Sequence, residues 1–387
     1  MIFQPQLRIP GPTPIPDRVM RAASKPMLDH RGPEFGKVVD DVVAGVKRVF
    51  ETDNDLLVYT ASGSGGLESA VANLVSPGDK VVVGIAGSFG ERFAGIAAAY
   101  GCEVVRLEVE WGLPLEPADL AAVLAAHPDA GVVLLTHNET SASITNPLPE
   151  LARVVREADR VLVVDGVSSV GSMPIRVDEL GIDVAITGSQ KGLMAPPGLV
   201  FVTVSGRAWE RSRTATSPRF YWDWKAVKDA QADSSTPFTP AISVFHAVQE
   251  GIRLLEEEGL ANVYERHRRI ADAVAASLPA IGFRLLGAEG YRSAVVTGAF
   301  PPDGTDVTAY RSLLRTKYGV IIGGGQGRMK GRIIRVGHLG AVTEGDMAQV
   351  LFAMEQALED LDIRPNEGRA AATLAAALAQ GATPAAV

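Results

Sequence analysis

Residues 161–198 read VLVVDGVSSVGSMPIRVDELGIDVAITGSQKGLMAPPG. Two short apolar runs in this stretch, VLVV and VAI, are typical of strands that are buried on both faces of a sheet. The carboxylate of Asp165 ends the first run, and Lys191 follows the second. The carboxyl ends of parallel strands meet at one edge of an open α/β sheet, where ligands bind. We therefore expect Asp165 and Lys191 to lie close together at such an edge.

The same alternation extends on both sides of this stretch. Amphipathic segments such as LESAVANLV, ERFAGIAAAYG and LPELARVVREA separate short runs rich in Val, Ile and Leu. This pattern predicts an α/β protein whose large domain has a mainly parallel sheet with helices on both faces. The seven expected strands lie within LLVYT (56–60), KVVVGI (80–85), EVVRLEV (103–109), GVVLLTH (131–137), RVLVVDG (160–166), DVAITGS (183–189) and GLVFVTV (198–204).

The second half of the chain changes in character twice. Residues 211–241 are aromatic, polar and proline-containing, which is typical of a functional loop or an interface. After two helical stretches, the runs FRLL, SAVVTGAF, GVIIGGG and RIIRVGHLG predict a smaller α+β domain. The predicted organisation is an N-terminal segment (1–16), a large domain (17–260), a small C-terminal domain (261–365) and an alanine-rich tail (366–387). We interpret the tail as a loosely attached helix without chemistry.

Composition narrows the class of protein. The chain has 37 Lys and Arg against 45 Asp and Glu, and it has no basic stripe, so we expect no nucleic-acid partner. Its start lacks the basic and apolar regions of a secretory signal, and no apolar run is long enough to cross a bilayer. We therefore expect a cytoplasmic protein that does not enter a membrane. The only cysteine, Cys102, allows no intrachain disulfide, and we interpret it as a buried, inert thiol.

Several common catalytic motifs are missing. The glycine-rich segments that start at Gly63 and Gly323 fail GxGxxG because Glu68 and Arg328 occupy the third glycine position. No GxxxxGK[ST] occurs, and no GxSxG surrounds a serine. The six histidines show no metal-ligand spacing, so no metal is expected.

Residues 60–69, TASGSGGLES, predict a strand end, a turn and the start of an amphipathic helix. The turn contains Ser62, Gly63 and Ser64, and a helix N-terminus with free amides and a glycine is a phosphate site. The alternative is a capping turn, in which the Ser62 hydroxyl binds the first helical amides. This motif alone leaves both interpretations open.

Together, a phosphate site, a carboxylate and a lysine match what pyridoxal phosphate requires. A lysine forms a Schiff base with the aldehyde, an aspartate pairs with the ring nitrogen, and a helix N-terminus holds the phosphate. Desolvation among small apolar neighbours would lower the pKa of Lys191 below the ordinary lysine value of about 10.4. A solvated or ion-paired lysine is the alternative if Lys191 is considered by itself.

Three segments, THNETSAS (136–143), VVDGVSSVG (163–171) and TGSQKGLMAPPG (187–198), resemble the class V aminotransferases of the fold-type I pyridoxal phosphate family. Within that family the chain is most similar to the alanine–glyoxylate, serine–glyoxylate and serine–pyruvate aminotransferase group. The resemblance covers nearly the whole chain, from PGPTPIP (10–16) to GRIIRVGHLG (331–340). It implies transamination between a small L-amino acid (alanine or serine) and a small 2-oxo acid (glyoxylate or pyruvate). It also implies a homodimer with shared active sites.

The resemblance further implies a role for each matching residue. Lys191 would be the Schiff-base lysine, and Asp165 would pair with the ring nitrogen. Arg335 would hold the substrate carboxylate, for which a guanidinium fork is suited, and Tyr221 would line the partner's site. The other implied cofactor contacts are Ser62, Gly63, Ser64 and Gln190 at the phosphate, Phe89 stacked on the ring, Thr140 near the ring hydroxyl, and Thr236 and Thr239 at the phosphate of the neighbouring subunit.

Three other functions compete with this one. Class V cysteine desulfurases need a nucleophilic cysteine in the small domain, whereas Cys102 lies elsewhere. Pyridoxamine–pyruvate aminotransferase shares AHPD, PFTP and RVGHLG, but it places a glutamate where the phosphate would lie, whereas this chain has the serines and glycine of 62–64. A non-catalytic binding protein would be expected to lose Lys191 or Arg335, and both are present.

Overall fold

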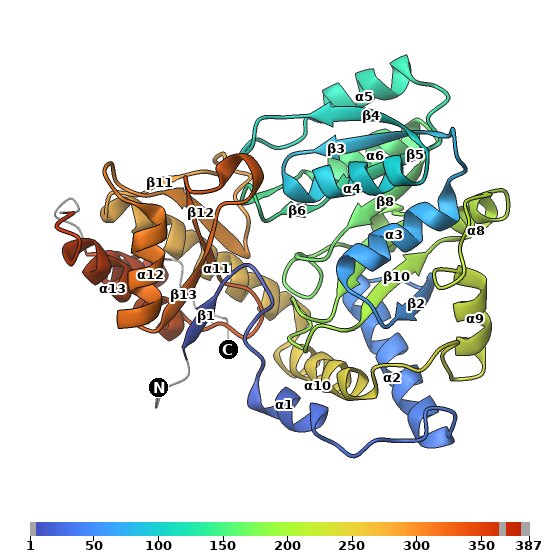
Figure 1. The fold of residues 1–387 in the computed structure, drawn as a ribbon, viewed down its shortest axis with the longest axis horizontal. Coiled ribbons are helices and arrows are strands. Elements are labelled where there is room, and N and C mark those ends of the chain that lie inside the picture. The colour runs from blue at the N-terminus through green and yellow to red at the C-terminus, as the bar shows by residue number, and fades with distance from the viewer. Residues whose placement is uncertain (1–4, 364–368, 381–387) are drawn as a thin grey trace.

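A computed structural model describes residues 5–363 and 369–380 of the protein. Its larger part is a seven-stranded sheet between two layers of helices (Figure 1). Six strands run parallel, and β10 is antiparallel to both of its neighbours. The prediction of a mainly parallel, seven-stranded sheet is confirmed. In spatial order the strands are β2 (Asp55–Tyr59), β10 (Val200–Val204), β9 (Val184–Gly188), β8 (Val161–Asp165), β5 (Val132–Thr136), β3 (Lys80–Ile85) and β4 (Glu103–Glu108).

Helices bury both faces of this sheet, and alternate side chains of each strand point to opposite faces. In β5, for example, Val133 and Leu135 join the core of one face, whereas Val132 and Leu134 join the core of the other. This double burial is why the strands appear in the sequence as continuous apolar runs. The first face is covered by α2 (Pro33–Phe50), α5 (Pro117–Ala126), α6 (Leu148–Glu157) and α10 (Ile242–Glu258), and the second by α3 (Gly63–Leu74), α4 (Ser88–Ala99), α8 (Gly206–Ser212) and α9 (Trp224–Ala232).

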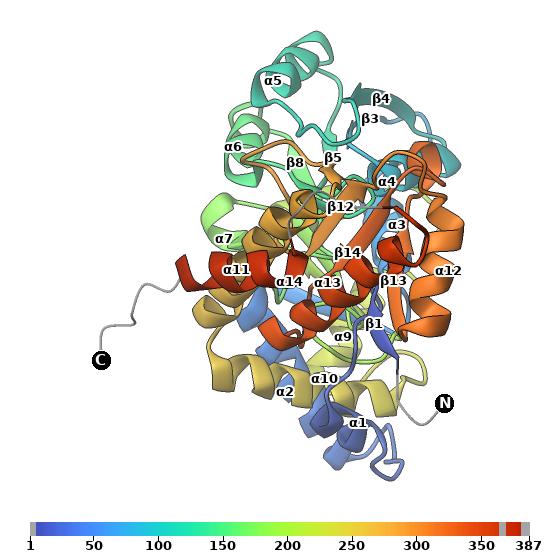
Figure 2. The same cartoon turned by 90° about the vertical axis from the view of Figure 1, so that its left-hand side faces the viewer.

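A second sheet of five strands forms with a core of its own. Its helices are α11 (Leu260–Ala280), α12 (Val307–Lys317), α13 (Glu344–Glu359) and α14 (Ala370–Gln380). In spatial order its strands are β1 (Gln6–Arg8), β13 (Val320–Gly324), β14 (Ile334–Gly337), β12 (Val296–Phe300) and β11 (Arg284–Leu285). Figure 2 shows β1 alongside β13, with which it pairs in parallel. The start of the chain therefore completes a sheet that is otherwise built from its last third.

Helix α14 is the described part of the alanine-rich tail, and its attachment differs from the sequence interpretation. The helix is present, but it packs on α11 and α13, and Ala370 and Leu374 are buried in the core of the small sheet. These two residues are four apart, so they share one helix face that is apolar despite the low complexity of the sequence. The tail helix is therefore not loosely attached. Residues 366–368 and 381–387 of the tail lie outside the described residues.

The segment 211–241 is mostly irregular, as expected, and α9 is the regular element within it. In it the ring of Tyr221 stacks on Phe238, with 4.9 Å between the ring centres, and the Phe220 side chain is 82% exposed. The remaining elements are α1 (Asp17–Ala23), which packs on α10, the two-stranded pair β6 (Asn138–Glu139) and β7 (Ile144–Thr145), α7 (Val177–Leu180) and the short 3₁₀ helix at Gly327–Met329. In the described part of the chain, no helix combines the length and the apolar character needed to cross a membrane.

Candidate active site

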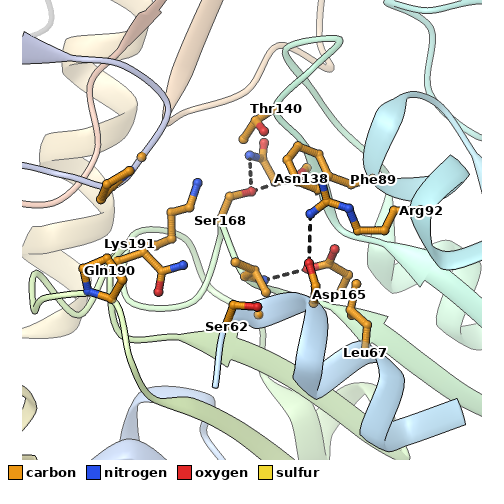
Figure 3. A pocket seen from close by; sticks show the side chains of 16 residues that line it. Ser62, Leu67, Phe89, Arg92, Asn138, Thr140, Asp165, Ser168, Gln190 and Lys191 are labelled. Atoms are coloured by element: carbon orange, nitrogen blue, oxygen red, sulfur yellow. Dashed lines mark hydrogen bonds between the residues drawn. The ribbon is translucent and has the colours of Figure 1, made fainter. Parts of the chain in front are cut away.

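A cavity of about 240 Å³ opens at the carboxyl edge of the parallel strands (Figure 3). Parallel strands bring their carboxyl ends to this edge, so residues from distant parts of the sequence meet there. The segments that follow β2, β3, β5, β8 and β9 each contribute residues to the cavity wall, whereas the segment after the edge strand β4 contributes none. The predicted positions that line it are Ser62, Gly63, Ser64, Phe89, Thr140, Asp165, Gln190 and Lys191.

Asp165 and Lys191 face this cavity from neighbouring strands. Asp165 ends β8 and is in register with Ile186 of β9, and Lys191 follows the end of β9 by three residues. Asp165 Oδ1 accepts a hydrogen bond of 2.9 Å from the amide of Val167. Burial raises the pKa of Asp165 from 3.8 to about 6, although the Val167 amide and the charge of Lys191 oppose the shift. The carboxylate therefore has little stabilisation of its own charge and is suited to receive a cationic partner.

Burial has the opposite effect on the pKa of Lys191, because its charged form is the protonated one. The pKa of Lys191 falls from 10.5 to about 8, and the Asp165 charge only partly opposes this shift. Lys191 Nζ donates a hydrogen bond to the carbonyl oxygen of Pro10. A Cβ atom at Gly11, whose φ is +117°, would lie 2.4 Å from that same Nζ. The N-terminal segment thus passes directly against the amine, and only glycine fits there.

The same segment also holds the backbone around the lysine. The amide of Thr13 donates to Gln190 O (3.1 Å), and the Thr13 hydroxyl donates to Lys191 O (3.3 Å). These contacts span about half of the chain in sequence. They position the lysine backbone as well as its amine.

The turn before α3 has the features of an anion site. Ser62 precedes the helix, and among the described residues its hydroxyl does not bond the first helical amides. The amides of Gly65 and Gly66 bond back to Ser62 O, whereas those of Gly63 and Ser64 meet no acceptor within residues 5–363 and 369–380. The capping interpretation of the Ser62 side chain is therefore wrong, and free donors face the cavity.

Gln190 adds a further unused polar group beside this turn. Its Oε1 atom is buried and has no hydrogen-bond partner in the described chain. The side chain folds over Gly188, where a Cβ atom would approach Oε1 to 2.9 Å. The free amides near Ser62, the unpartnered Gln190, the buried Asp165 and a lysine of lowered pKa together fit the phosphate, ring nitrogen and aldehyde of pyridoxal phosphate.

Phe89 is held at the cavity by a buried carboxylate that sequence reasoning missed. Glu139 Oε2 accepts from the amides of Phe89 (3.0 Å) and Gly90 (3.2 Å), and its Oε1 accepts from the amide of Ser141 (3.1 Å). Burial raises the pKa of Glu139, and these hydrogen bonds oppose the shift. The carboxylate therefore caps the start of α4 from outside the helix. A lone glutamate in a predicted loop gives no sequence signal of this role.

Among the lining residues that sequence reasoning missed, three have polar side chains, namely Arg92, Asn138 and Ser168. Asn138 Nδ2 donates to Ser168 Oγ (2.9 Å), and Ser168 Oγ donates to Asn138 O (2.9 Å). The available signal was their spacing: Asn138 comes two residues after the end of β5, and Ser168 comes three after Asp165. Arg92 follows Phe89 by three residues, which places both on one face of α4.

Arg335 lies beside the cavity but is absent from its lining. The side chain is 6% exposed, and it donates from Nε to Gly324 O (2.8 Å) and from Nη1 to Thr140 O (3.0 Å). Burial lowers the pKa of Arg335 to about 10, and the charge of Glu139 opposes the shift. The guanidinium is thereby held in a fixed orientation next to Thr140.

Thr236, Thr239 and Tyr221 do not join Lys191 within the described chain. They line a separate small pocket with Phe238 and other residues. The Thr236 hydroxyl donates to Phe238 O (2.8 Å), and the Tyr221 hydroxyl donates to the carbonyl oxygen of Thr60 (3.1 Å). Across the described residues, no group of three or more His, Cys, Asp or Glu side chains is placed to hold a metal ion.

Comparison with known proteins agrees with this geometry. Residues 8–343 match the family model described as aminotransferase class-V. The serine–glyoxylate aminotransferase of Methylorubrum extorquens is 33% identical over 380 residues, which cover 95% of this chain and 94% of that protein. A Synechococcus protein named soluble hydrogenase, small subunit, is 39% identical over 373 residues, which cover 95% and 97% of the two chains.

Among solved structures, pyridoxamine–pyruvate aminotransferase from Mesorhizobium loti superposes with a TM-score of 0.93 at 28% identity, covering 98% of both chains. The fold-type I architecture expected from the sequence is therefore confirmed. The family model spans most of the chain, and a lysine, an aspartate and a free helix N-terminus meet in one cavity, so the chain belongs to the class V aminotransferases, which are pyridoxal phosphate enzymes.

Proposed function

We propose that the protein transfers an amino group between alanine or serine and a small 2-oxo acid, glyoxylate or pyruvate. The observation that carries this proposal is the convergence of Lys191 and Asp165 on one cavity from the ends of β9 and β8. The full-length similarity to a serine–glyoxylate aminotransferase supports the substrate class.

In this reaction pyridoxal phosphate supplies an aldehyde that bonds an amine and a ring that withdraws electrons from the substrate Cα. Lys191 would hold the aldehyde, and its Nζ, when not bonded to the cofactor, would be placed to move the proton at the substrate Cα. A positioned proton donor and acceptor of this kind contributes about 10²–10⁴-fold to the rate. Asp165 would pair with the ring nitrogen, and Phe89 would pack against the ring.

The other predicted contacts are proposed from their place in the fold. Ser62, Gly63, Ser64 and Gln190 would hold the phosphate with free amides, hydroxyls and an amide side chain, and Thr140 would lie near the ring hydroxyl. Arg335 would hold the substrate carboxylate through Nη2, since its Nε and Nη1 are committed to backbone carbonyl oxygens.

We further propose a homodimer in which Thr236, Thr239 and Tyr221 serve the cavity of the partner. These residues line a pocket separate from that of Lys191, and the exposed Phe220 packs on Phe238 beside them; both observations support this arrangement. If it is correct, mixing inactive Lys191→Ala subunits with inactive Thr236→Ala, Thr239→Ala subunits restores activity in the hybrid dimers, whose sites include an intact set. Absence of recovery after verified subunit exchange would contradict the shared site.

The cytoplasmic location stays a prediction of the sequence.

The reaction is tested one half at a time. Enzyme loaded with cofactor is mixed separately with alanine, serine, glycine and aspartate, and the cofactor absorbance is followed; glyoxylate, pyruvate or oxaloacetate is then added to reverse the change. We expect alanine or serine to give the fastest first half and glyoxylate or pyruvate the fastest return. The Lys191→Ala variant serves as the inactive control. If no amino acid changed the spectrum of the wild-type enzyme, the aminotransferase assignment would be wrong.

A second candidate function, pyridoxamine–pyruvate transamination, is favoured by the structural match to the Mesorhizobium loti enzyme. The free donors at Gly63 and Ser64 argue for a phosphorylated cofactor instead, because they suit an anion. Purified protein without cofactor, supplied with pyridoxamine and pyruvate, distinguishes the two. Turnover under those conditions would select the second candidate.

A further inference from the structure

Arg92 is a cation at the cavity that the roles assigned above leave unused. It projects from α4 into the cavity lining, and its Nη1 donates a 2.9 Å hydrogen bond to Ser64 Oγ (Figure 3). The guanidinium carbon lies 5.1 Å from the centre of the Phe89 ring. Arg92 therefore touches both the turn proposed to hold the phosphate and the ring proposed to stack on the cofactor.

The cavity offers few positive charges to balance the negative charge of a bound phosphate group. The ionisable side chains that line it are Arg92, Asp165 and Lys191. With pyridoxal phosphate bound, Asp165 would pair with the ring nitrogen, and Lys191 would carry no free ammonium group while bonded to the aldehyde. A phosphate monoester carries about −1.5 to −2 charges near pH 7. The N-terminus of α3 offsets only about half a charge, so Arg92 is the side chain left to supply the rest.

Within the described ranges no carboxylate lies at ion-pair distance from Arg92, although the charge of Arg92 acts on Asp165 across the cavity and lowers its pKa against the effect of burial. Its neighbour Glu91 pairs instead with Arg106 (2.7 Å), and Arg92 forms no ion pair with any described residue. Its present contacts are a neutral hydroxyl and an aromatic face, both of which leave donors of the guanidinium free. Guanidinium groups bind phosphate oxygens through charge-assisted, often bidentate hydrogen bonds.

We propose that Arg92 binds the phosphate of the cofactor together with Ser64. This inference rests on the proposed placement of the phosphate at the N-terminus of α3. Because the guanidinium also covers Phe89, Arg92 links the group that anchors the phosphate to the group that covers the ring. Phosphate binding thereby helps to fix the orientation of the stacking side chain.

The test compares two ligands that differ only in the phosphate. Apoenzyme is titrated with pyridoxal phosphate and with pyridoxal, and binding is followed by absorbance and by quenching of tryptophan fluorescence. We expect Arg92→Met to weaken pyridoxal phosphate binding by about 10- to 100-fold, the range for hydrogen bonds to charged groups, and to leave pyridoxal binding unchanged. Arg92→Lys should recover part of the loss because it keeps the charge. Inorganic phosphate should compete with pyridoxal phosphate on the wild-type apoenzyme and much less on Arg92→Met.

The matched control is Arg106→Met, which removes another exposed arginine that contacts α4 through Glu91 but does not line the cavity. It should leave the binding of both ligands unchanged. If Arg92→Met lost the same affinity for both ligands, Arg92 would act only through Phe89 or the fold. If it lost affinity for neither ligand, Arg92 would not reach the phosphate. Either result overturns the proposal. A wild-type enzyme that bound the two ligands equally well would instead reject the phosphate site at α3 itself. Near-ultraviolet circular dichroism checks folding, and Arg92→Gln replaces the methionine variant if that variant does not fold.

Discussion

The lowered pKa of Lys191 predicts when the apoenzyme can capture its cofactor. Only the neutral amine attacks an aldehyde. A lysine with a pKa of about 8 is about 9% neutral at pH 7, against about 0.03% for a pKa of 10.5. At equal nucleophilicity, burial therefore makes capture at pH 7 about 300-fold faster than for an exposed lysine. The capture rate should rise about tenfold per pH unit below pH 8 and level off above it.

Stopped-flow absorbance measures this rate after apoenzyme is mixed with excess pyridoxal phosphate between pH 6 and pH 10. The reaction of the cofactor with N-acetyl-lysine over the same range corrects for titration of the cofactor itself. A corrected rate that kept rising tenfold per unit up to pH 10 would refute the reasoning, because it would show an ordinary lysine with a solvated ammonium group.

A variant of Asp165 tests how far the charge of Asp165 opposes the effect of burial on the Lys191 pKa. The charge of Asp165 opposes the lowering of the Lys191 pKa, so Asp165→Asn should move the break in the profile below pH 8. Asp183→Asn is the matched control, because Asp183 is also buried but directly precedes Val184, at the opposite end of β9. An unchanged break in Asp165→Asn would mean that the two groups do not interact.

Three further outcomes follow from particular contacts. Gly11→Ala should slow cofactor capture at least about tenfold, because its Cβ would overlap Lys191 Nζ. The control is Gly78→Ala, which has a similar positive φ but nothing within 4 Å and should lose only stability. Equal capture rates of the two variants in stopped-flow would contradict the steric argument. Glu139→Gln should lower the free energy of unfolding by about 1.5–3 kcal/mol in urea titrations, because an amide cannot accept all the hydrogen bonds that the carboxylate accepts. An unchanged urea midpoint would show that Glu139 does not stabilise the start of α4. The only cysteine, Cys102, is half-buried, not fully buried as the sequence interpretation expected. Desolvation nevertheless raises its pKa to about 11, so iodoacetamide at pH 8 should label native protein about 100-fold more slowly than urea-unfolded protein. Similar rates detected by mass spectrometry would show an accessible thiolate.

The fold and the central pair of the site follow from the sequence because both depend on local patterns. The six strands other than β4 are buried on both faces and need apolar side chains at nearly every position, so they appear as short apolar runs. The edge strand β4 is partly exposed, and only its Val and Leu residues mark it in the sequence. Parallel neighbours must end at the same edge, which places Asp165 beside Lys191 without knowledge of any contact. The turn of Ser62 was placed by the same reasoning, but only the structure separates a capping hydroxyl from a free one.

The residues that were missed have no local signature. Arg92 is an exposed helical arginine, which by sequence alone is a solvated surface residue. Glu139 lies in a polar segment, and its burial depends on how α4 packs over β6. The strand β1 has three residues, which is too short to establish a period of two. In each case the information lies in a tertiary contact between segments that are far apart in the sequence.

The path of residues 6–13 has a practical consequence for anyone who alters the start of this chain. These residues first pair with β13 in the small sheet, then contact the Lys191 amine through Pro10 and hold the lysine backbone through Thr13. A truncation or fusion that displaced them would remove an edge strand and, in the same step, the acceptor for the amine. Residues 6–13 therefore join the small sheet to the surroundings of Lys191, and any expression tag added before them belongs behind a cleavable or well-separated linker.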